Sequence, residues 1–243
     1  RRLCARFAAV PHQQLRRLRC KDAHFSDLAP LAQLTALQEL DMDGCAGVTS
    51  LAPLAALPLQ RLALRGRRLV AQLGPLAALG PTLRCLELGG SFQPISLDPL
   101  AQLSKLTQLS LHSFAADALD TAPLGGLTAL QQLSLRESMG VTSLDALSGL
   151  TQLHTLDLSH CSRVADWRPL AQLTALRRLE LCATPIADLA PLSAMDTLRQ
   201  LDLSGCVFVQ SLRPLSRLTA LEELCATGCE EMTSLEALRS LGA

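Results

Sequence analysis

The chain has 243 residues, no net formal charge and 49% hydrophobic residues. That apolar content is enough for a packed core and excludes global disorder. The balanced charge gives no support for binding to nucleic acid or to an anionic membrane. No run of about 18 apolar residues is present, so the sequence predicts no membrane-spanning helix.

Leucine is far more frequent than in an ordinary protein, at 57 of 243 residues. A phrase of the form L-x-x-L-x-L-x-x-(C/S/T) returns every 22 to 24 residues. Its ten copies begin at Leu15, Leu37, Leu59, Leu83, Leu106, Leu130, Leu153, Leu176, Leu198 and Leu221. One unit of this length cannot bury its own leucines, whereas several stacked units can. The period therefore predicts a solenoid of ten units over residues 15–243.

Residues 1–14 precede the first copy and differ from it. Leu3 and Phe7 share one face at helical spacing with the small Cys4 and Ala8, and Pro11 ends the run. We expect an N-terminal capping helix that covers the open leucine row of the first unit. At the other end, the sequence stops within a copy of the repeat, and we expect the repeat domain to be truncated there.

Each unit has two halves. In the first half leucines alternate with polar residues, as at Leu156 and Leu158, which predicts a half-buried strand. The second half has apolar residues at three-residue spacing and, in most units, a proline near its start, which predicts a short helix or 3₁₀ segment. Side chains expected to cap that turn are Asp27, Ser50, Asp188, Ser211 and Ser234. Crossovers of one sense make the strands parallel, and their narrow spacing curves the stack with the sheet on the concave side.

These units resemble leucine-rich repeats of the short, roughly 22-residue type. The phrase DLAPLAQLTALQELDMDGC resembles internalin and phosphatase-1 regulatory-subunit repeats, and LDLSGC and LDLSHC resemble leucine-rich-repeat proteins of protists such as trypanosomatids. The resemblance implies an α/β leucine-rich-repeat solenoid. This is a curved right-handed stack with a parallel concave sheet and short helices or 3₁₀ segments on the convex side. Because this fold hosts many functions, the resemblance predicts the fold more strongly than the activity.

The ninth position of such repeats is usually Asn, but here it is often a small residue. Cysteine stands there in four units, at Cys45, Cys161, Cys206 and Cys229. A thiol is small, buries easily and keeps a weak S–H donor, so we expect these four to be inward-facing and reduced. At the same position Arg67 and Phe114 are expected to fit poorly and to make their units irregular. Trp167 replaces a core leucine of other units and is expected to be buried.

The third, fifth and seventh positions of each unit are expected to face outward on the concave side. In the first three units these columns alternate in charge, as Arg17–Glu39–Arg61 and Lys21–Asp43–Arg65. Opposite charges on adjacent strands attract, so we interpret this region as a self-paired salt ladder, with a partner site as the alternative.

Toward the C-terminus the fifth column carries three carboxylates in a row. Asp157, Glu180 and Asp202 have only Arg178 beside them. We call these three carboxylates the acidic stripe, and interpret it either as solvated surface or as a site for a basic partner. The candidate protein-binding residues are Asp157, Glu180, Asp202, Arg178, Arg136 and His112.

The sequence carries no catalytic motif, no glycine-rich phosphate loop and no metal-ligand spacing, so we expect no enzyme activity, cofactor or metal. The favoured hypothesis is a protein-interaction scaffold or a structural subunit of a larger intracellular assembly. One alternative is a surface or secreted recognition protein of the internalin kind. Another is the substrate-recognition module of a ubiquitin ligase complex. Nine cysteines, an odd number without Cys-x-x-Cys, favour a reducing, cytoplasmic compartment.

Overall fold

A computed structural model describes residues 14–20, 27–45, 47–65, 73–90, 95–114, 119–236 and 238–239. These residues form one ten-stranded sheet in which every pairing is parallel and the spatial order of the strands is their order in the sequence. The predicted capping helix lies outside the described residues, except for Gln14. No helix in the described ranges is long and apolar enough to cross a membrane.

Each unit contributes one short strand. The strands are β1 (Arg17–Arg19), β2 (Glu39–Asp41), β3 (Arg61–Arg65), β4 (Cys85–Gly89), β5 (Gln108–His112), β6 (Gln132–Ser134), β7 (Thr155–Asp157), β8 (Arg178–Glu180), β9 (Gln200–Asp202) and β10 (Glu223–Cys225). The leucine at the centre of each three-residue strand pairs in register with its counterpart on the next, as Leu156 does with Leu179. Equivalent leucines therefore form continuous rows between units.

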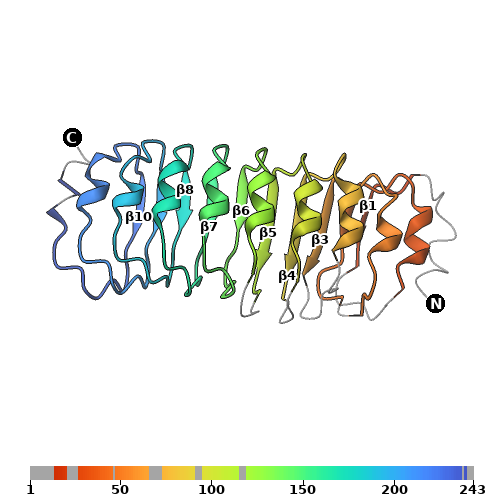
Figure 1. Cartoon of the computed structure of the whole chain (residues 1–243), viewed down its shortest axis with the longest axis horizontal. Helices are drawn as coiled ribbons and strands as arrows, with labels where there is room; N and C mark the ends of the chain where they lie inside the picture. Colours follow the sequence, from red (N-terminus) through yellow and green to blue (C-terminus); the bar gives the residue numbers. More distant parts are fainter. Residues whose placement is uncertain are drawn as a thin grey trace.

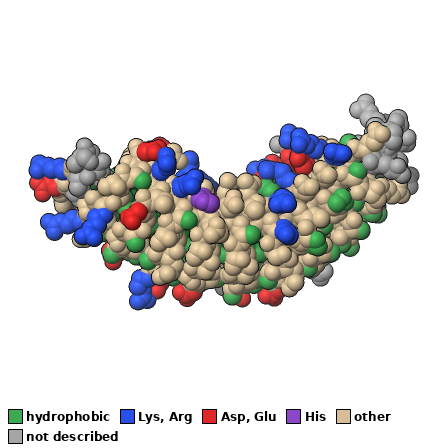
Figure 2. Space-filling model, turned by 90° about the horizontal axis from the view of Figure 1, so that it is seen from above, with side chains coloured by type: hydrophobic (Ala, Val, Ile, Leu, Met, Phe, Trp, Pro, Cys, Tyr) green, Lys and Arg blue, Asp and Glu red, His purple; other side chains and the backbone are tan. Residues whose placement is uncertain are grey.

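The second half of each unit is a 3₁₀ helix, as one of the two predicted forms. The helices are η1 (Ala29–Gln33), η2 (Ala52–Leu54), η3 (Gly74–Leu79), η4 (Asp98–Gln102), η5 (Ala122–Gly126), η6 (Asp145–Gly149), η7 (Arg168–Gln172), η8 (Ala190–Leu192) and η9 (Arg213–Arg217). They form a layer opposite the sheet (Figure 1). Seen from above, the molecule is a crescent with a hollowed face (Figure 2).

Proline and a side-chain oxygen begin these helices as the sequence predicts. Eight of the nine helices have proline at the first or second position, where its missing N–H would be unbonded anyway. The cap lies one residue earlier than the helix N-cap: Asp27 Oδ1 accepts from the N–H of Ala29 at 2.8 Å, and Ser211 Oγ from that of Arg213 at 3.2 Å. The same bond recurs at Ser50, Asp188 and Ser234.

The core is one continuous cluster that runs the length of the stack. Trp167 belongs to it, as predicted. The four ninth-position cysteines are buried too, and each thiol donates to a backbone carbonyl of the preceding unit, as Cys161 Sγ does to Leu135 O at 3.1 Å. Among the described residues no cysteine is in a disulfide. Their reduced state in the cell stays a prediction.

The structure corrects expectations about individual positions. Phe114 does not fit poorly: it is completely buried, and its N–H donates to Ser138 Oγ at 3.3 Å. Residues 115–118 lie outside the described residues, so the irregularity expected of this unit stays a prediction. Arg67 lies outside the described residues. Ser159 was expected on the exposed concave face but has no exposed surface. Strand β7 ends at Asp157, so the alternation of a strand no longer directs the side chain two residues later.

Candidate functional site

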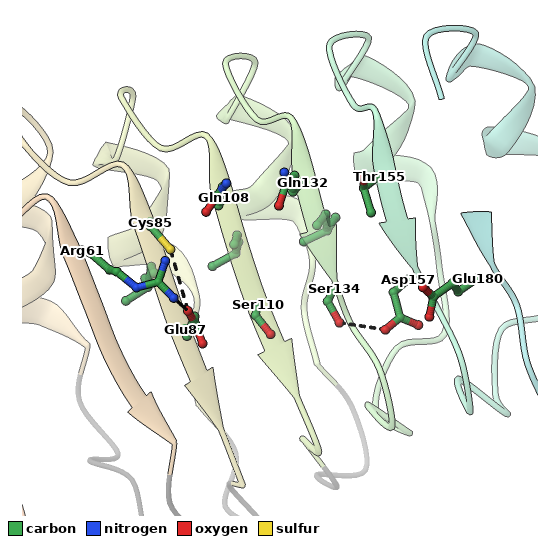
Figure 3. A pocket seen from close by; sticks show the side chains of 13 residues that line it. Arg61, Cys85, Glu87, Gln108, Ser110, Gln132, Ser134, Thr155, Asp157 and Glu180 are labelled. Atoms are coloured by element: carbon green, nitrogen blue, oxygen red, sulfur yellow. Dashed lines mark hydrogen bonds and ion pairs between the residues drawn. The ribbon is translucent and has the colours of Figure 1, made fainter. Parts of the chain in front are cut away.

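A groove runs across the strands on the concave face. It has a volume of about 370 Å³ and runs from β3 to β8. Three leucines form its floor, and third- and fifth-position side chains line it (Figure 3). These polar lining residues are Arg61, Cys85, Glu87, Gln108, Ser110, Gln132, Ser134, Thr155, Asp157 and Glu180. We call this feature the concave groove.

At the β3–β4 end of the groove, two guanidinium groups hold one carboxylate. Arg61 and Arg65 both pair with Glu87, Arg65 at 3.0 Å, and only 14% of the Glu87 side chain is exposed. The predicted salt ladder is therefore only partly correct. Arg17 pairs with Glu39 at 3.1 Å as expected. Arg61 and Arg65 instead turn away from β2 toward β4, because long side chains reach either neighbouring strand.

The middle of the groove carries amides and hydroxyls and no charge. Gln108 lies opposite Gln132 across β5 and β6, and Ser110 lies opposite Ser134. Both glutamine side chains point into the groove (Figure 3). An amide offers both donors and an acceptor, so this part of the surface suits a partner with free peptide groups.

At the other end lies the acidic stripe, in the predicted register. Asp157 lies opposite Glu180 on the next strand, and Glu180 lies opposite Asp202. Asp157 accepts from the Ser159 N–H at 2.9 Å and from Ser134 Oγ at 3.2 Å. Asp202 accepts from the Ser204 N–H at 2.8 Å. The two aspartates thus also fix the turn that ends their own strand.

Arg178, which the sequence places beside the acidic stripe, pairs with its middle member, Glu180. Arg178, on the same strand, donates from Nε to Glu180 Oε1 at 2.6 Å. This pairing raises the pKa of Arg178, first through the hydrogen bond and then through the carboxylate charge. Three carboxylates and one guanidinium still leave this end negative.

The last two predicted site residues are Arg136 and His112. They stand at the seventh position of their units, one column away from the fifth-position carboxylates of the acidic stripe. Arg136 Nε donates to its neighbour Glu137 at 3.4 Å. The imidazole of His112 lies over Gly89, where a Cβ would fall 2.3 Å from its Cε1. Burial lowers the pKa of His112, and the nearby Arg65 lowers it further. Neither residue lines the groove, so the structure separates them from Asp157 and Glu180.

The side chains that line the groove can offer ion pairs and hydrogen bonds to a ligand. Among the residues that the structure describes, no group of three or more His, Cys, Asp or Glu side chains is placed to hold a metal ion. Burial raises the pKa of the Cys161 thiol to about 12, so little of the nucleophilic thiolate is present near neutral pH. The groove offers paired charges at its ends and neutral hydrogen-bonding groups between them.

Solved structures of other proteins share this architecture. An internalin, InlF of Listeria monocytogenes, aligns with a TM-score of 0.73 at 22% identity and covers 95% of this chain and 72% of its own. The leucine-rich repeat domain of the type III effector XopL aligns with a TM-score of 0.55 at 23% identity, over 68% and 67% of the chains. The chain has a leucine-rich-repeat fold.

A third leucine-rich-repeat neighbour is a plant peptide hormone receptor, RGFR1, solved in complex with RGF2. It aligns with a TM-score of 0.62 at 18% identity, over 86% of this chain and 37% of the receptor. No protein-family model matches the sequence, and no curated protein matches it at a significant level.

Sequence reasoning missed most of the lining of this leucine-rich-repeat groove. It identified Asp157 and Glu180 but not Glu87, Gln108 or Gln132. The signal was present, because all of these stand at the third or fifth position, which the pattern already predicts to face the concave side. A run of like charges distinguishes Asp157 and Glu180, whereas Gln108 and Gln132 are neutral and Glu87 stands alone in its column between Ala63 and Ser110.

Proposed function

We propose that this chain is a non-enzymatic protein-interaction module that binds a segment of a partner protein along the concave groove. The observation that carries the proposal is the groove itself, with amides and hydroxyls that line it over buried leucines. The plant receptor of the same fold, solved with RGF2, supports a peptide-like ligand by analogy of fold.

The acidic stripe is the place where we propose that a basic residue of the partner binds. Asp157 and Glu180 line the groove, and Asp202 lies on the next strand in the same column. Such contacts would raise the association rate and weaken as salt increases, because exposed charges are screened over about 8–10 Å. Charge reversal at Asp157 and Glu180 should therefore weaken partner binding.

We propose a cytoplasmic scaffold or a subunit of a larger assembly as the role. Support comes from the described cysteines, none of which is in a disulfide. Four of them replace the usual turn residue and bond to backbone carbonyls. Such a column needs no disulfide and suits a reducing compartment. Detection of the chain on a cell surface or in the medium would favour the internalin-like alternative instead.

A groove-filling substitution tests the proposed site. Ser134 lies on the concave side of β6, so Ser134→Arg places a long side chain in the hollow. Gln172→Arg, at an exposed position of η7 on the opposite layer, is the matched control. Quantitative affinity purification should show partners that are retained by the native chain and Gln172→Arg and lost by Ser134→Arg. If Ser134→Arg is folded by circular dichroism and keeps every partner, the groove is not the binding site.

A further inference from the structure

The two ends of the concave groove carry opposite net charge. At β3–β4, Arg61 lines the groove and Arg65 lies beside it. The two share the single carboxylate of Glu87, which leaves one excess positive charge on these two strands. At β7–β9, the three carboxylates of the acidic stripe face the single guanidinium of Arg178, which leaves two excess negative charges. Strands β5 and β6 between them contribute no charged side chain to the lining.

The side chains that line the groove also indicate which backbone conformation of a partner segment fits there. The middle of the groove presents the amides of Gln108 and Gln132, which suit free peptide N–H and C=O groups. A helix hides those groups and needs an apolar groove for its hydrophobic face. The leucines beneath this groove are fully or almost fully buried, and no aromatic side chain lines it among the described residues. An extended segment is therefore the better match.

The distance between the ends sets the length of that segment. From β3 to β7 the sheet advances by four strand spacings, which is about 19 Å at about 4.8 Å each. An extended chain rises about 3.3 Å per residue, so it covers this span in about six residues.

We propose that the groove selects an extended, zwitterionic segment of its partner that lies across the strands. An acidic residue of the segment lies over Arg61 and Arg65, and a basic residue about six positions away lies over Asp157 and Glu180. Small or amide side chains occupy the positions between them. Either order of the two charges along the segment fits, since the chain direction reverses with it. This inference rests on the proposed function and specifies its ligand.

The first test is a selection from phage-displayed random 12-residue peptides on the native protein, counter-selected on Ser134→Arg. The expected result is enrichment of peptides in which an acidic and a basic residue stand five to seven positions apart. Enriched peptides without that charge pair would overturn the inference while leaving the proposed function intact. Failure to enrich any peptide that distinguishes the native groove from the filled one would overturn both.

The second test locates each charge by a double-mutant cycle, measured by fluorescence anisotropy on a selected peptide. Replacing the peptide's basic residue by Gln should weaken binding to the native protein by about fivefold, the upper range for an exposed ion pair. The same replacement should have almost no effect on the double variant Asp157→Asn/Glu180→Gln. Asn at 157 retains a side-chain oxygen for the Ser159 N–H, so the turn is preserved.

The opposite end supplies the matched control. Replacing the peptide's acidic residue by Gln should weaken binding equally to the native protein and to Asp157→Asn/Glu180→Gln, and should lose its effect on Arg61→Gln. If either peptide charge couples to the wrong end of the groove, or to neither, the proposed arrangement is incorrect. Thermal unfolding followed by circular dichroism verifies that each variant is folded.

Discussion

Neighbouring residues on strand β7 belong to two regions that behave differently. Leu156 is completely buried, and the equivalent Leu179 of the next unit is buried to the same extent. Asp157, one residue along, bonds to a serine hydroxyl and a turn N–H, whereas the equivalent Glu180 bonds to an arginine on its own strand. The interior has equivalent buried leucines in successive units, while the side-chain contacts of the concave surface differ from unit to unit. Stability therefore resides in the repeated residues and specificity in the variable ones.

Thiol reactivity should separate the two regions by the largest factor. Cys161 lies in the interior, and burial raises its pKa from 9.0 to about 12, which reduces its thiolate fraction roughly a thousandfold. Cys225 lies on the concave side of β10, and its hydrogen bonds with Ser204, first, and with Thr227 lower its pKa. We expect iodoacetamide to label Cys225 first and Cys161 last, as read by peptide mass spectrometry. Equal rates in the native state would contradict the division.

Substitutions in the interior and on the concave surface should change the free energy of unfolding just as unequally. Leu156→Ala removes a fully buried side chain from the middle of the stack and should lower the free energy of unfolding by about 2–5 kcal/mol, through lost transfer energy and the cavity left behind. Gln132→Ala, at an exposed position of β6, should change it by less than about 0.5 kcal/mol. Urea titration measures both. Comparable losses would mean that the interior and surface positions have been exchanged.

The sequence predicted the interior almost completely, because each unit repeats the same physical requirement. The leucine rows, the proline column, the turn caps at Asp27 and Ser211, and the burial of Trp167 all follow from spacing. The surface was less predictable. Alternation placed Ser159 outside, but it holds only while the strand lasts, and β7 ends two residues earlier.

The sequence also could not predict which oppositely charged residue each long charged side chain pairs with. Arg61 has a carboxylate on the strand at either side, Glu39 on β2 and Glu87 on β4. Both arrangements satisfy the charge pattern, and only the geometry of the side chains brings Arg61 together with Arg65 on Glu87. That choice brings both guanidinium groups onto Glu87 at the β3–β4 end of the concave groove.

Two buried serines test the boundary between the regions. Ser138 Oγ donates to Leu111 O at 2.8 Å and accepts from the Phe114 N–H, so Ser138→Ala leaves two backbone groups without these bonds and should cost about 1–3 kcal/mol. Ser159 Oγ is buried without a partner. Ser159→Ala removes that unsatisfied hydroxyl and should stabilise the fold by up to about 1 kcal/mol. Opposite signs in thermal or urea unfolding are the expected outcome, and a loss at both positions would show that Ser159 has a role its surroundings do not reveal.

The smallest expected effect concerns the turn that joins the two regions. The eighth position of the unit is left-handed, with φ of +72° at Gly205 and +52° at Ala183 in the preceding unit. A side chain in this conformation costs about 1–2 kcal/mol, and glycine loses about 0.5–1 kcal/mol of that advantage through chain entropy. Ala183→Gly should therefore stabilise the fold by about 0.5–1 kcal/mol.

Gly205→Ala is the reciprocal change and isolates the cost of the left-handed backbone conformation. A Cβ at Gly205 would lie 3.5 Å from Ala183 Cα, an ordinary contact, so no steric clash adds to the conformational cost. We expect a loss of about 0.5–1 kcal/mol, equal in size and opposite in sign to the gain from Ala183→Gly. The double variant should then return close to the native stability in urea unfolding. A gain from alanine at Gly205 would show that the turn does not require the left-handed conformation, and the regular junction between interior and surface would need another cause.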